Sequence, residues 1–297
     1  MATTQLMANP VPLQTLKLRD YYTLTKPEVN LLILMTTSAG YYLASRGPLR
    51  IWGLVSTLLG TLLVASGTAT LNQWMERVWD GNMRRTASRP LPSGRLKSRE
   101  ALVFGILLSV AGGLFLLVAV NTLSALLAVS TLLSYLLVYT PLNRKTPLCT
   151  LLGAFPGAMP TLIGWAGASA SINRQAWLLF AIVFLWQFPH FLAIALMYRD
   201  DYSRAGYRML PEFDRDTRFT RMEILGFALI LVFTTLLPLL GRAGPLYGAA
   251  MCAAGAFLLY YVFKLAGSST TIRASRLLHA SVLYLPVVLV IMVASKN

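Results

Sequence analysis

The stretch that ends at Asp80 carries an amide and two carboxylates, Asn72, Glu76 and Asp80, at intervals of four residues. It overlaps the end of an uncharged run, 51–75. Residues four apart on a helix are neighbours, so these side chains would form one stripe roughly 12 Å long. Three oxygen-bearing side chains on one face suit Mg²⁺, which keeps several waters and completes its shell with substrate phosphates. The spacing therefore indicates a magnesium site, with a solvated helix end as the alternative.

Arginines follow this stripe closely. They are Arg84, Arg85, Arg89 and Arg95. Guanidinium groups bind phosphate through two parallel hydrogen bonds. Acids for a metal beside cations for the remaining phosphate oxygens are what a Mg²⁺–diphosphate requires. The sequence contains no GxxxxGK(S/T) stretch, which argues against a P-loop nucleotide site.

A second charged cluster follows the uncharged run 175–198. It contains Arg199, Asp200, Asp201 and Arg204. Adjacent residues on a helix point about 100° apart, so we expect one of the two aspartates to face the site, and the spacing leaves open which one. Asp200 and Arg204 are four apart and are expected to pair. A charged anchor at the membrane interface is the alternative interpretation.

Two further sets of residues could extend the site. Tyr139 ends an uncharged run, and Arg144 and Lys145 after it could add cations to a diphosphate site or only orient the chain. His190 lies about two turns before the second cluster, and a histidine at membrane depth faces the bundle interior by default. It could ligate a metal, including iron, or hydrogen-bond to a neighbouring helix. His279, near the start of the last run, is more typical of an interfacial polar residue.

The elements that must position these residues are long and apolar. Of the 297 residues, 56% are hydrophobic and 12% are charged, where a soluble domain carries roughly 25% charged residues. The uncharged runs are 29–45, 51–75, 101–143, 146–173, 175–198, 224–241, 243–263 and 277–295. A bilayer core takes about 20 apolar residues as helix, so the run 101–143 is long enough for two spans, separated around Asn121. Because backbone groups in lipid must pair within each segment, we predict an all-α polytopic membrane protein with nine spans.

The charges give the orientation. Of the 26 Lys and Arg, 21 fall in the connections on the side of the N-terminus, which places the N-terminus in the cytoplasm and the C-terminus outside. All 11 Asp and Glu fall on that same side. Ionisable groups at membrane depth are costly and usually functional, so we expect an active site at the cytoplasmic ends of the helices. The net charge of +15 is then mainly an orientation signal, with anionic membrane lipid rather than nucleic acid as the partner.

The chain divides simply. We expect an N-terminal tail, 1–20, and one intramembrane domain, 21–297. Within the domain, Gly and Pro concentrate at 153–167, where small residues let helices approach closely and Pro156 and Pro160 would kink the helix. This stretch could form the wall of a cavity or a packing surface.

The first stripe resembles a motif of a known family. Asn-x₃-acid-x₃-Asp followed by Met-x-Arg-Thr-x-x-Arg-Pro, over 72–90, is similar to the first motif of the UbiA-type intramembrane prenyltransferases. The stretches Tyr139–Trp165 and Pro189–Leu210 look like the branch that farnesylates haem rather than the quinone branch. The resemblance extends over 18–295.

This resemblance implies nine helices around a central cavity, with Mg²⁺ and an isoprenyl diphosphate bound at the cytoplasmic end. It implies transfer of a farnesyl group from farnesyl diphosphate to a vinyl group of haem B, which gives haem O and diphosphate. It also implies a location in the bacterial inner membrane, with haem A synthase or terminal oxidase assembly as candidate protein partners.

Carried over residue by residue, the resemblance assigns roles to the charged clusters. The catalytic group is Asn72, Glu76, Asp80, Asp200 and Asp201. The metal ligands are Asn72, Glu76, Asp80 and Asp201. The diphosphate group is Arg84, Arg85, Arg89, Tyr139, Arg144, Lys145, Arg199 and Arg204. A haem acceptor also needs a flat aromatic slot, for which the candidates are His190 and Trp186, with Trp165, Phe188 and Phe191.

Two positions depart from the family pattern. Glu76 stands where the superfamily usually has Asp, and its extra methylene would shift the metal. Arg204 stands near the place where a DxxxD spacing would put a second acid, so a symmetric two-magnesium arrangement is not expected. The second cluster would then hold metal through one carboxylate, with an arginine supplying charge.

Two other functions fit part of the pattern. A prenyltransferase acting on an aromatic quinone precursor would keep the same metal site. A transporter of an anionic lipid or metabolite would fit the uncharged spans and basic connections. Transport needs polar groups at mid-depth, however, and the carboxylates lie on one side only.

Overall fold

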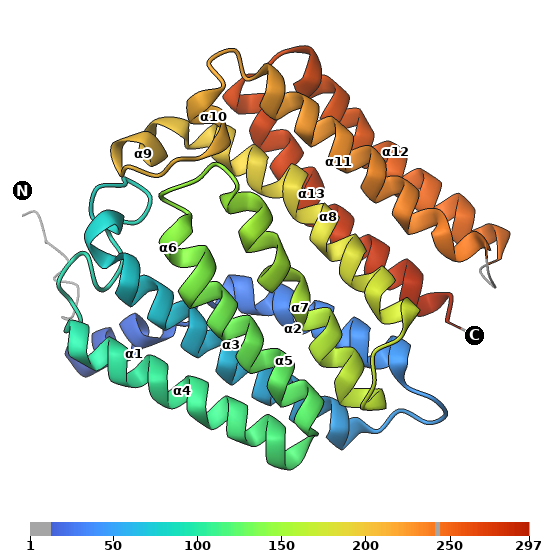
Figure 1. The fold of residues 1–297 in the computed structure, drawn as a ribbon, viewed down its shortest axis with the longest axis horizontal. Helices are drawn as coiled ribbons and strands as arrows, with labels where there is room; N and C mark the ends of the chain where they lie inside the picture. Colours follow the sequence, from blue (N-terminus) through green and yellow to red (C-terminus); the bar gives the residue numbers. More distant parts are fainter. Residues whose placement is uncertain (1–12, 241–243, 297) are drawn as a thin grey trace, which may run out of the picture.

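The computed structural model describes residues 13–240 and 244–296, and every regular element in that part is helical. The long helices lie side by side in one bundle (Figure 1). In chain order the elements are α1 (Leu13–Leu24), α2 (Pro27–Ala44), α3 (Ile51–Asp80), α4 (Ser98–Ala119), α5 (Thr122–Leu133), the π-helical turn η1 (Ser134–Tyr139), α6 (Thr140–Leu142), α7 (Cys149–Ser169), α8 (Arg174–Met197), α9 (Arg199–Arg204), α10 (Leu210–Phe213), α11 (Arg218–Leu236), the 3₁₀ turn η2 (Leu237–Leu240), α12 (Pro245–Gly267) and α13 (Thr271–Ala294).

Eight helices in the described part are long and apolar enough to cross a membrane, which confirms the predicted all-α membrane protein. They are α3, α4, the continuous segment from α5 to α6, α7, α8, α11, α12 and α13. Helix α2 corresponds to the first predicted span, but it has 18 residues and carries Glu28 and Asn30 in its first turn. The count of nine spans and the cytoplasmic N-terminus therefore stay predictions.

The predicted break in the long run 101–143 is confirmed at Asn121. Its side-chain oxygen accepts a hydrogen bond from the Ser124 backbone N–H at 2.8 Å and so caps the start of α5. Its amide donates to the carbonyl oxygen of Ala166 in α7 at 2.9 Å. One side chain thus begins a helix and fixes the turn against a neighbouring span.

Helices α7 and α8 bury the largest share of their residues among the spans and form the centre of the bundle. The Gly- and Pro-rich stretch lies in α7, where it packs against α2. A Cβ atom at Gly164 would overlap the Thr37 carbonyl group, and one at Gly40 would overlap the Thr161 carbonyl group. The stretch is therefore a helix-packing surface, since only glycine permits this approach of the two backbones.

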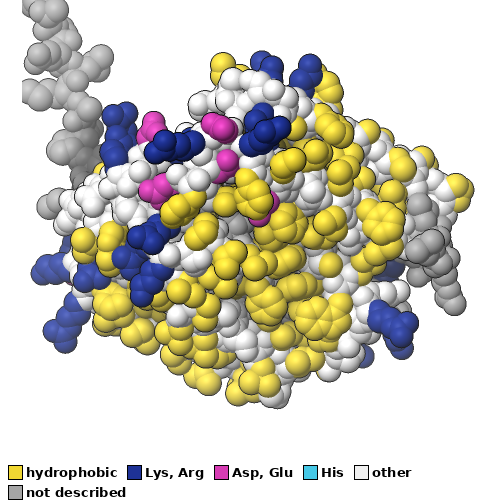
Figure 2. Space-filling model, turned by 45° about the horizontal axis from the view of Figure 1, so that its top comes forward, with side chains coloured by type: hydrophobic (Ala, Val, Ile, Leu, Met, Phe, Trp, Pro, Cys, Tyr) yellow, Lys and Arg dark blue, Asp and Glu magenta, His cyan; other side chains and the backbone are white. Residues whose placement is uncertain are grey.

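One end of the bundle carries the charged connections. The α3–α4 connection, 81–97, folds back there, and its buried Met83 packs with Tyr207 from the segment between α9 and α10. Arg95 pairs with Asp20 of α1 at 2.9 Å. Figure 2 shows acidic side chains gathered at this end above an apolar flank. The clusters that the sequence places on one side of the membrane therefore meet at one end of the fold.

The predicted division between a tail and a domain at residue 20 falls inside α1, which begins at Leu13. Residues 1–12 lie outside the described part of the chain. The division itself stays a prediction.

The close approach of α2 and α7 predicts the effect of a single methyl group. Gly164→Ala should lower the free energy of unfolding by about 1–3 kcal/mol, because the added Cβ meets backbone that cannot move aside. Gly226→Ala in α11 is the matched control, because a Cβ there meets no atom within 4 Å. Thermal unfolding of the purified proteins in the same detergent is the measurement. Equal transition temperatures for the two variants would contradict this account of the interface.

Candidate active site

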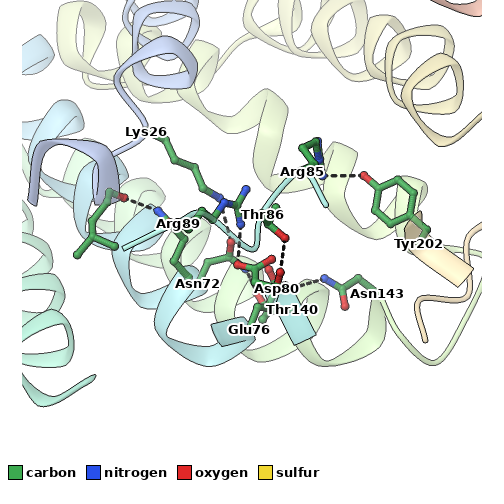
Figure 3. A network of polar contacts seen from close by, with 12 residues as sticks. Lys26, Asn72, Glu76, Asp80, Arg85, Thr86, Arg89, Thr140, Asn143 and Tyr202 are labelled. Carbon is green, nitrogen blue, oxygen red and sulfur yellow. Dashed lines mark hydrogen bonds and ion pairs between the residues drawn. The ribbon is translucent and has the colours of Figure 1, made fainter. Parts of the chain in front are cut away.

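The last turns of α3 carry the predicted stripe. The helix runs unbroken to Asp80, so Asn72, Glu76 and Asp80 share one face, as predicted. These residues are only 2%, 8% and 2% exposed. Figure 3 shows the stripe with side chains from other segments directed at it. Because a buried carboxylate is stable only when paired and hydrogen-bonded, its partners define the chemistry of the site.

Each member of the stripe has a partner from a distant segment. Arg89 donates to Asp80 Oδ2 at 2.7 Å and forms an ion pair with it. The Asn143 side-chain amide donates to Glu76 Oε1 at 2.6 Å. The Asn72 amide donates to the Thr140 hydroxyl oxygen at 3.2 Å. The stripe is therefore held from the α3–α4 connection on one side and from the segment after η1 on the other.

A lysine that the sequence analysis missed completes this set. Lys26 lies in the left-handed region, with φ at 51°, between α1 and α2. Its Nζ donates to Asn72 Oδ1 at 3.0 Å. Burial lowers the pKa of Lys26 from 10.5 to about 8, as does the nearby Arg89, while Glu76 and Asp80 act in the opposite direction. The only sequence signal was a lysine followed by proline just before the first apolar run.

The predicted diphosphate-binding cations divide into those near the stripe and those at the surface. Arg85 donates to the Tyr202 hydroxyl at 3.1 Å, and its guanidinium lies 5.2 Å from the ring centroid of Tyr198. Burial raises the pKa of Tyr202, so its hydroxyl stays protonated. Arg144 lies 3.4 Å from the ring centroid of Trp79. Exposed members of the group are Arg84, Arg85, Lys145 and Arg204.

The second cluster begins a separate short helix, α9, after α8 ends. Asp201 is buried and Asp200 is exposed, and which of the two faces the substrate stays a prediction. The expected pair between Asp200 and Arg204 is wrong, because Arg204 pairs with Asp201, three residues before it. Burial explains this choice, since the buried carboxylate gains more from a cation than the solvated one. Arg199 donates to the Arg215 carbonyl oxygen at 3.4 Å.

The stripe is the part of the site that fits a metal. Among the described residues, no three His, Cys, Asp or Glu side chains gather closely enough to hold an ion, so Asp201 does not join Glu76 and Asp80 in one ligand group. The stripe offers two carboxylates and the amide oxygen of Asn72. Beside it, Oδ1 of Asn143 is buried and has no hydrogen-bond partner among the described residues. The oxygen atoms of the stripe accept hydrogen bonds from ammonium and guanidinium groups. Oxygen atoms of this kind are also the ligands that a hard divalent cation requires.

The predicted haem residues lie deeper, on α8. His190 stacks on Trp186, with ring centroids 4.6 Å apart. The Nδ1 of His190 lies 2.9 Å from Ser281 Oγ on α13, and that hydroxyl donates to the Leu278 carbonyl oxygen. Since the serine proton is engaged, Nδ1 is the donor and Nε2 keeps its lone pair. Trp186 Nε1 donates to the Ser281 carbonyl oxygen at 2.7 Å, so both rings are fixed to one residue of α13.

The other aromatic candidates for the haem slot differ from one another in burial and in contacts. Phe188 is buried and stacks on Phe227 with centroids 3.7 Å apart, so its ring is already engaged. Phe191 is partly exposed, and Trp165 is buried with its Nε1 lacking a hydrogen-bond partner in the described structure. Tyr139, which was predicted to bind diphosphate, packs against Tyr135 with ring centroids 4.8 Å apart. The structure therefore brings His190 and Trp186 together but does not gather all the candidates into one slot.

The fold and the sequence agree on a protein family. Residues 33–284 match the UbiA prenyltransferase family, and the chain belongs to it. The protein is thus a membrane-embedded prenyltransferase. Solved structures of similar fold include a digeranylgeranylglyceryl phosphate synthase, with a TM-score of 0.77 at 19% identity over 94% of this chain and 98% of that one. A UbiA homologue from Archaeoglobus fulgidus bound to DMAPP and Mg²⁺ has a TM-score of 0.71 at 16% identity, over 92% and 99%.

More similar sequences carry a specific name, protoheme IX farnesyltransferase. The protein of that name from Solibacter usitatus is 47% identical over 289 residues, which cover 94% of this chain and 99% of that protein. The one from Koribacter versatilis is 43% identical and covers 100% of this chain and 99% of that protein. Both relatives match along almost their whole length.

The surroundings of Lys26 predict its titration. In the metal-free protein, Lys26 should lose its proton as the pH rises through about 8, because desolvation disfavours the charged form. The contact between its ammonium group and Asn72 is then complete only below that pH. Reductive ¹³C-methylation followed by NMR titration measures the midpoint, and Lys26→Arg identifies the resonance by removing it. A midpoint near the ordinary lysine value of about 10.4 would refute the predicted desolvation.

Proposed function

We propose that the chain transfers a farnesyl group from farnesyl diphosphate to a vinyl group of haem B, giving haem O and diphosphate. The observation that carries the proposal is the buried stripe Asn72–Glu76–Asp80, which lies among cations at the end of an apolar bundle. The choice of haem over a quinone precursor is supported by the shared name of the relatives, which match along almost the whole chain.

The stripe and the cations have separate roles in this proposal. Asn72, Glu76 and Asp80 would hold Mg²⁺, which supplies charge that offsets the leaving diphosphate. Asp201 belongs to the metal group only through the family resemblance, since it pairs with Arg204 in this structure. The basic and phenolic side chains would bind the diphosphate oxygens: Arg84, Arg85, Arg89, Tyr139, Arg144, Lys145, Arg199 and Arg204.

The bond changes follow from these positions. The C1–O bond of the farnesyl group breaks, and its electron pair leaves with diphosphate, whose charge the arginines stabilise as it develops. The π electrons of the haem vinyl group form the new bond to C1. Water adds to the resulting cation and loses a proton, which leaves a hydroxyl group. The apolar side chains of the bundle keep bulk water from the allylic cation before it is captured.

The porphyrin would lie against α8. His190 keeps the lone pair of Nε2 because Nδ1 is engaged by Ser281, and a second hydrogen bond of this kind orients histidine ligands at metal centres. Trp186 supplies a flat ring stacked on the same imidazole. We further place the active site on the cytoplasmic side of the bacterial inner membrane. Haem A synthase or terminal oxidase assembly would then receive the product.

The proposal predicts a selective effect of Asp80→Asn. Protein in membranes supplied with haem B, farnesyl diphosphate and Mg²⁺ should form a product whose mass corresponds to hydroxyethylfarnesyl haem. Asp80→Asn should lower turnover by about a hundredfold or more, because a neutral amide replaces a buried charge at the reacting centre. Asp216→Asn, at an exposed acid, is the control and should retain activity. Near-normal turnover of Asp80→Asn with Mg²⁺ would show that the carboxylate has no part in the reaction.

A further inference from the structure

A second candidate binding site lies outside the region described above, in an open groove of about 520 Å³ between α12 and α13. It is at the same end of the bundle as the acidic stripe. Helix α11 begins at that end, after the charged connection that contains α9, and Arg221 at its start donates to the Ala266 carbonyl oxygen at the end of α12. Figure 1 shows the turn from α12 to α13 near the start of α11. The groove is lined by Phe257, Tyr260, Tyr261, Lys264, Arg273, Arg276, His279, Ala280 and Leu283.

The groove is positively charged and contains no acid. Lys264, Arg273 and Arg276 line it, and the sequence has no Asp or Glu after Glu223. None of the ion pairs among the described residues uses these three cations. Arg273 is fixed in place, since it donates to the carbonyl oxygens of Lys264 at 2.9 Å and Ser268 at 3.3 Å. Cations arranged without counter-charges predict a ligand with at least two negative groups.

His279 adds an open metal ligand. Its Nδ1 lies 2.7 Å from the carbonyl oxygen of Ser275, and a carbonyl can only accept, so Nδ1 carries the proton. The lone pair is then on Nε2, and the side chain is exposed in the groove. Metal-binding histidines are commonly oriented by such a bond from the other ring nitrogen to a carbonyl group.

The remaining walls are aromatic and apolar. Phe257 and Tyr261 lie edge to face at 5.3 Å, and Tyr260 and Tyr261 at 5.1 Å. Along α13 the arginines come first, then His279, then Leu283, so the charged part of the groove is nearest the end of the bundle. A ligand that satisfies all of it is flat and apolar, with carboxylates at one edge and a metal at its centre. A phospholipid headgroup would use the cations but leave the imidazole without a role.

We propose that this groove binds haem, with the propionates on Arg273, Arg276 and Lys264 and with Nε2 of His279 on the iron, as a docking site separate from the reaction site. The identity of the porphyrin rests on the proposed function. The groove and the His190 site lie on different faces of α13, because His279 is exposed whereas Ser281, which holds His190, is buried. Two residues along a helix correspond to a rotation of about 200°.

The test counts haem sites. The full chain in phosphatidylcholine nanodiscs is titrated with ferric haem and followed by the Soret band and by high-spin EPR, because a single imidazole leaves ferric iron high-spin. Wild-type protein should bind two equivalents, and His279→Ala should lose one of them. Arg276→Gln should weaken that same equivalent about tenfold or more while retaining its imidazole signature, because it removes a carboxylate contact and keeps the hydrogen bonds by which Arg273 holds the turn. Arg174→Gln is the charge control, because Arg174 begins α8 at the end of the bundle opposite to the groove. Thermal unfolding checks that each variant folds.

The outcomes separate the docking site from the proposed function. A single equivalent that His190→Ala removes and His279→Ala leaves intact, in protein that still forms product, would overturn the docking site alone. Protein that binds no haem and forms no product would overturn both. Nanodiscs containing phosphatidylglycerol test the lipid alternative: if anionic lipid abolishes the His279-dependent equivalent, the groove is a lipid headgroup site and the proposal is wrong.

Discussion

The burial of two carboxylates at the end of α3 is the constraint on which the rest of the site depends. Glu76 and Asp80 lie almost out of contact with solvent, and a buried carboxylate without partners is strongly destabilising. Arg89 donates to Asp80 and Asn143 donates to Glu76, while Lys26 donates to Asn72 beside them, and these three partners come from three connections. These connections must therefore fold inward over the end of the bundle. The left-handed backbone at Lys26 is one local consequence, because it turns the chain so that the ammonium group reaches the stripe.

The two acidic clusters are joined by cations and rings rather than by a shared set of carboxylates. Arg85 from the α3–α4 connection reaches Tyr202 in α9, and Met83 beside it packs with Tyr207. Asp201 meanwhile pairs with its own neighbour, Arg204. The site is thus asymmetric: one cluster offers oxygen atoms whose cationic partners come from other segments, and the other offers a carboxylate already paired within its own short helix. An asymmetric arrangement suits a substrate whose metal-bound end and free phosphate oxygens need different partners.

The sequence predicted the features that depend on local pattern. Helix periodicity placed the stripe on one face of α3, and the polar break at Asn121 ended one span and began the next. Features that depend on distant contacts were missed. Nothing near Lys26 or Asn143 indicates that each contacts α3, since those contacts span 46 and 67 residues. The pairing of Arg204 was predicted wrongly because spacing alone does not say which of two adjacent aspartates is buried.

The two histidines were distinguished from the sequence, which placed His190 toward the bundle interior and His279 at the interface. Both lie in apolar runs, and both engage Nδ1 so that Nε2 is open. Their difference comes from α13, which turns Ser281 toward α8 and the half-buried His190 while it turns His279 outward beside arginines. Helix α13 therefore separates an apolar interior from a charged groove at the surface. Burying a cation in the interior, away from water, would cost free energy. A ligand with an apolar plane and carboxylates at its edge would contact the charged groove first. Its carboxylates lose the least hydration there, because the arginines of the groove remain exposed to solvent.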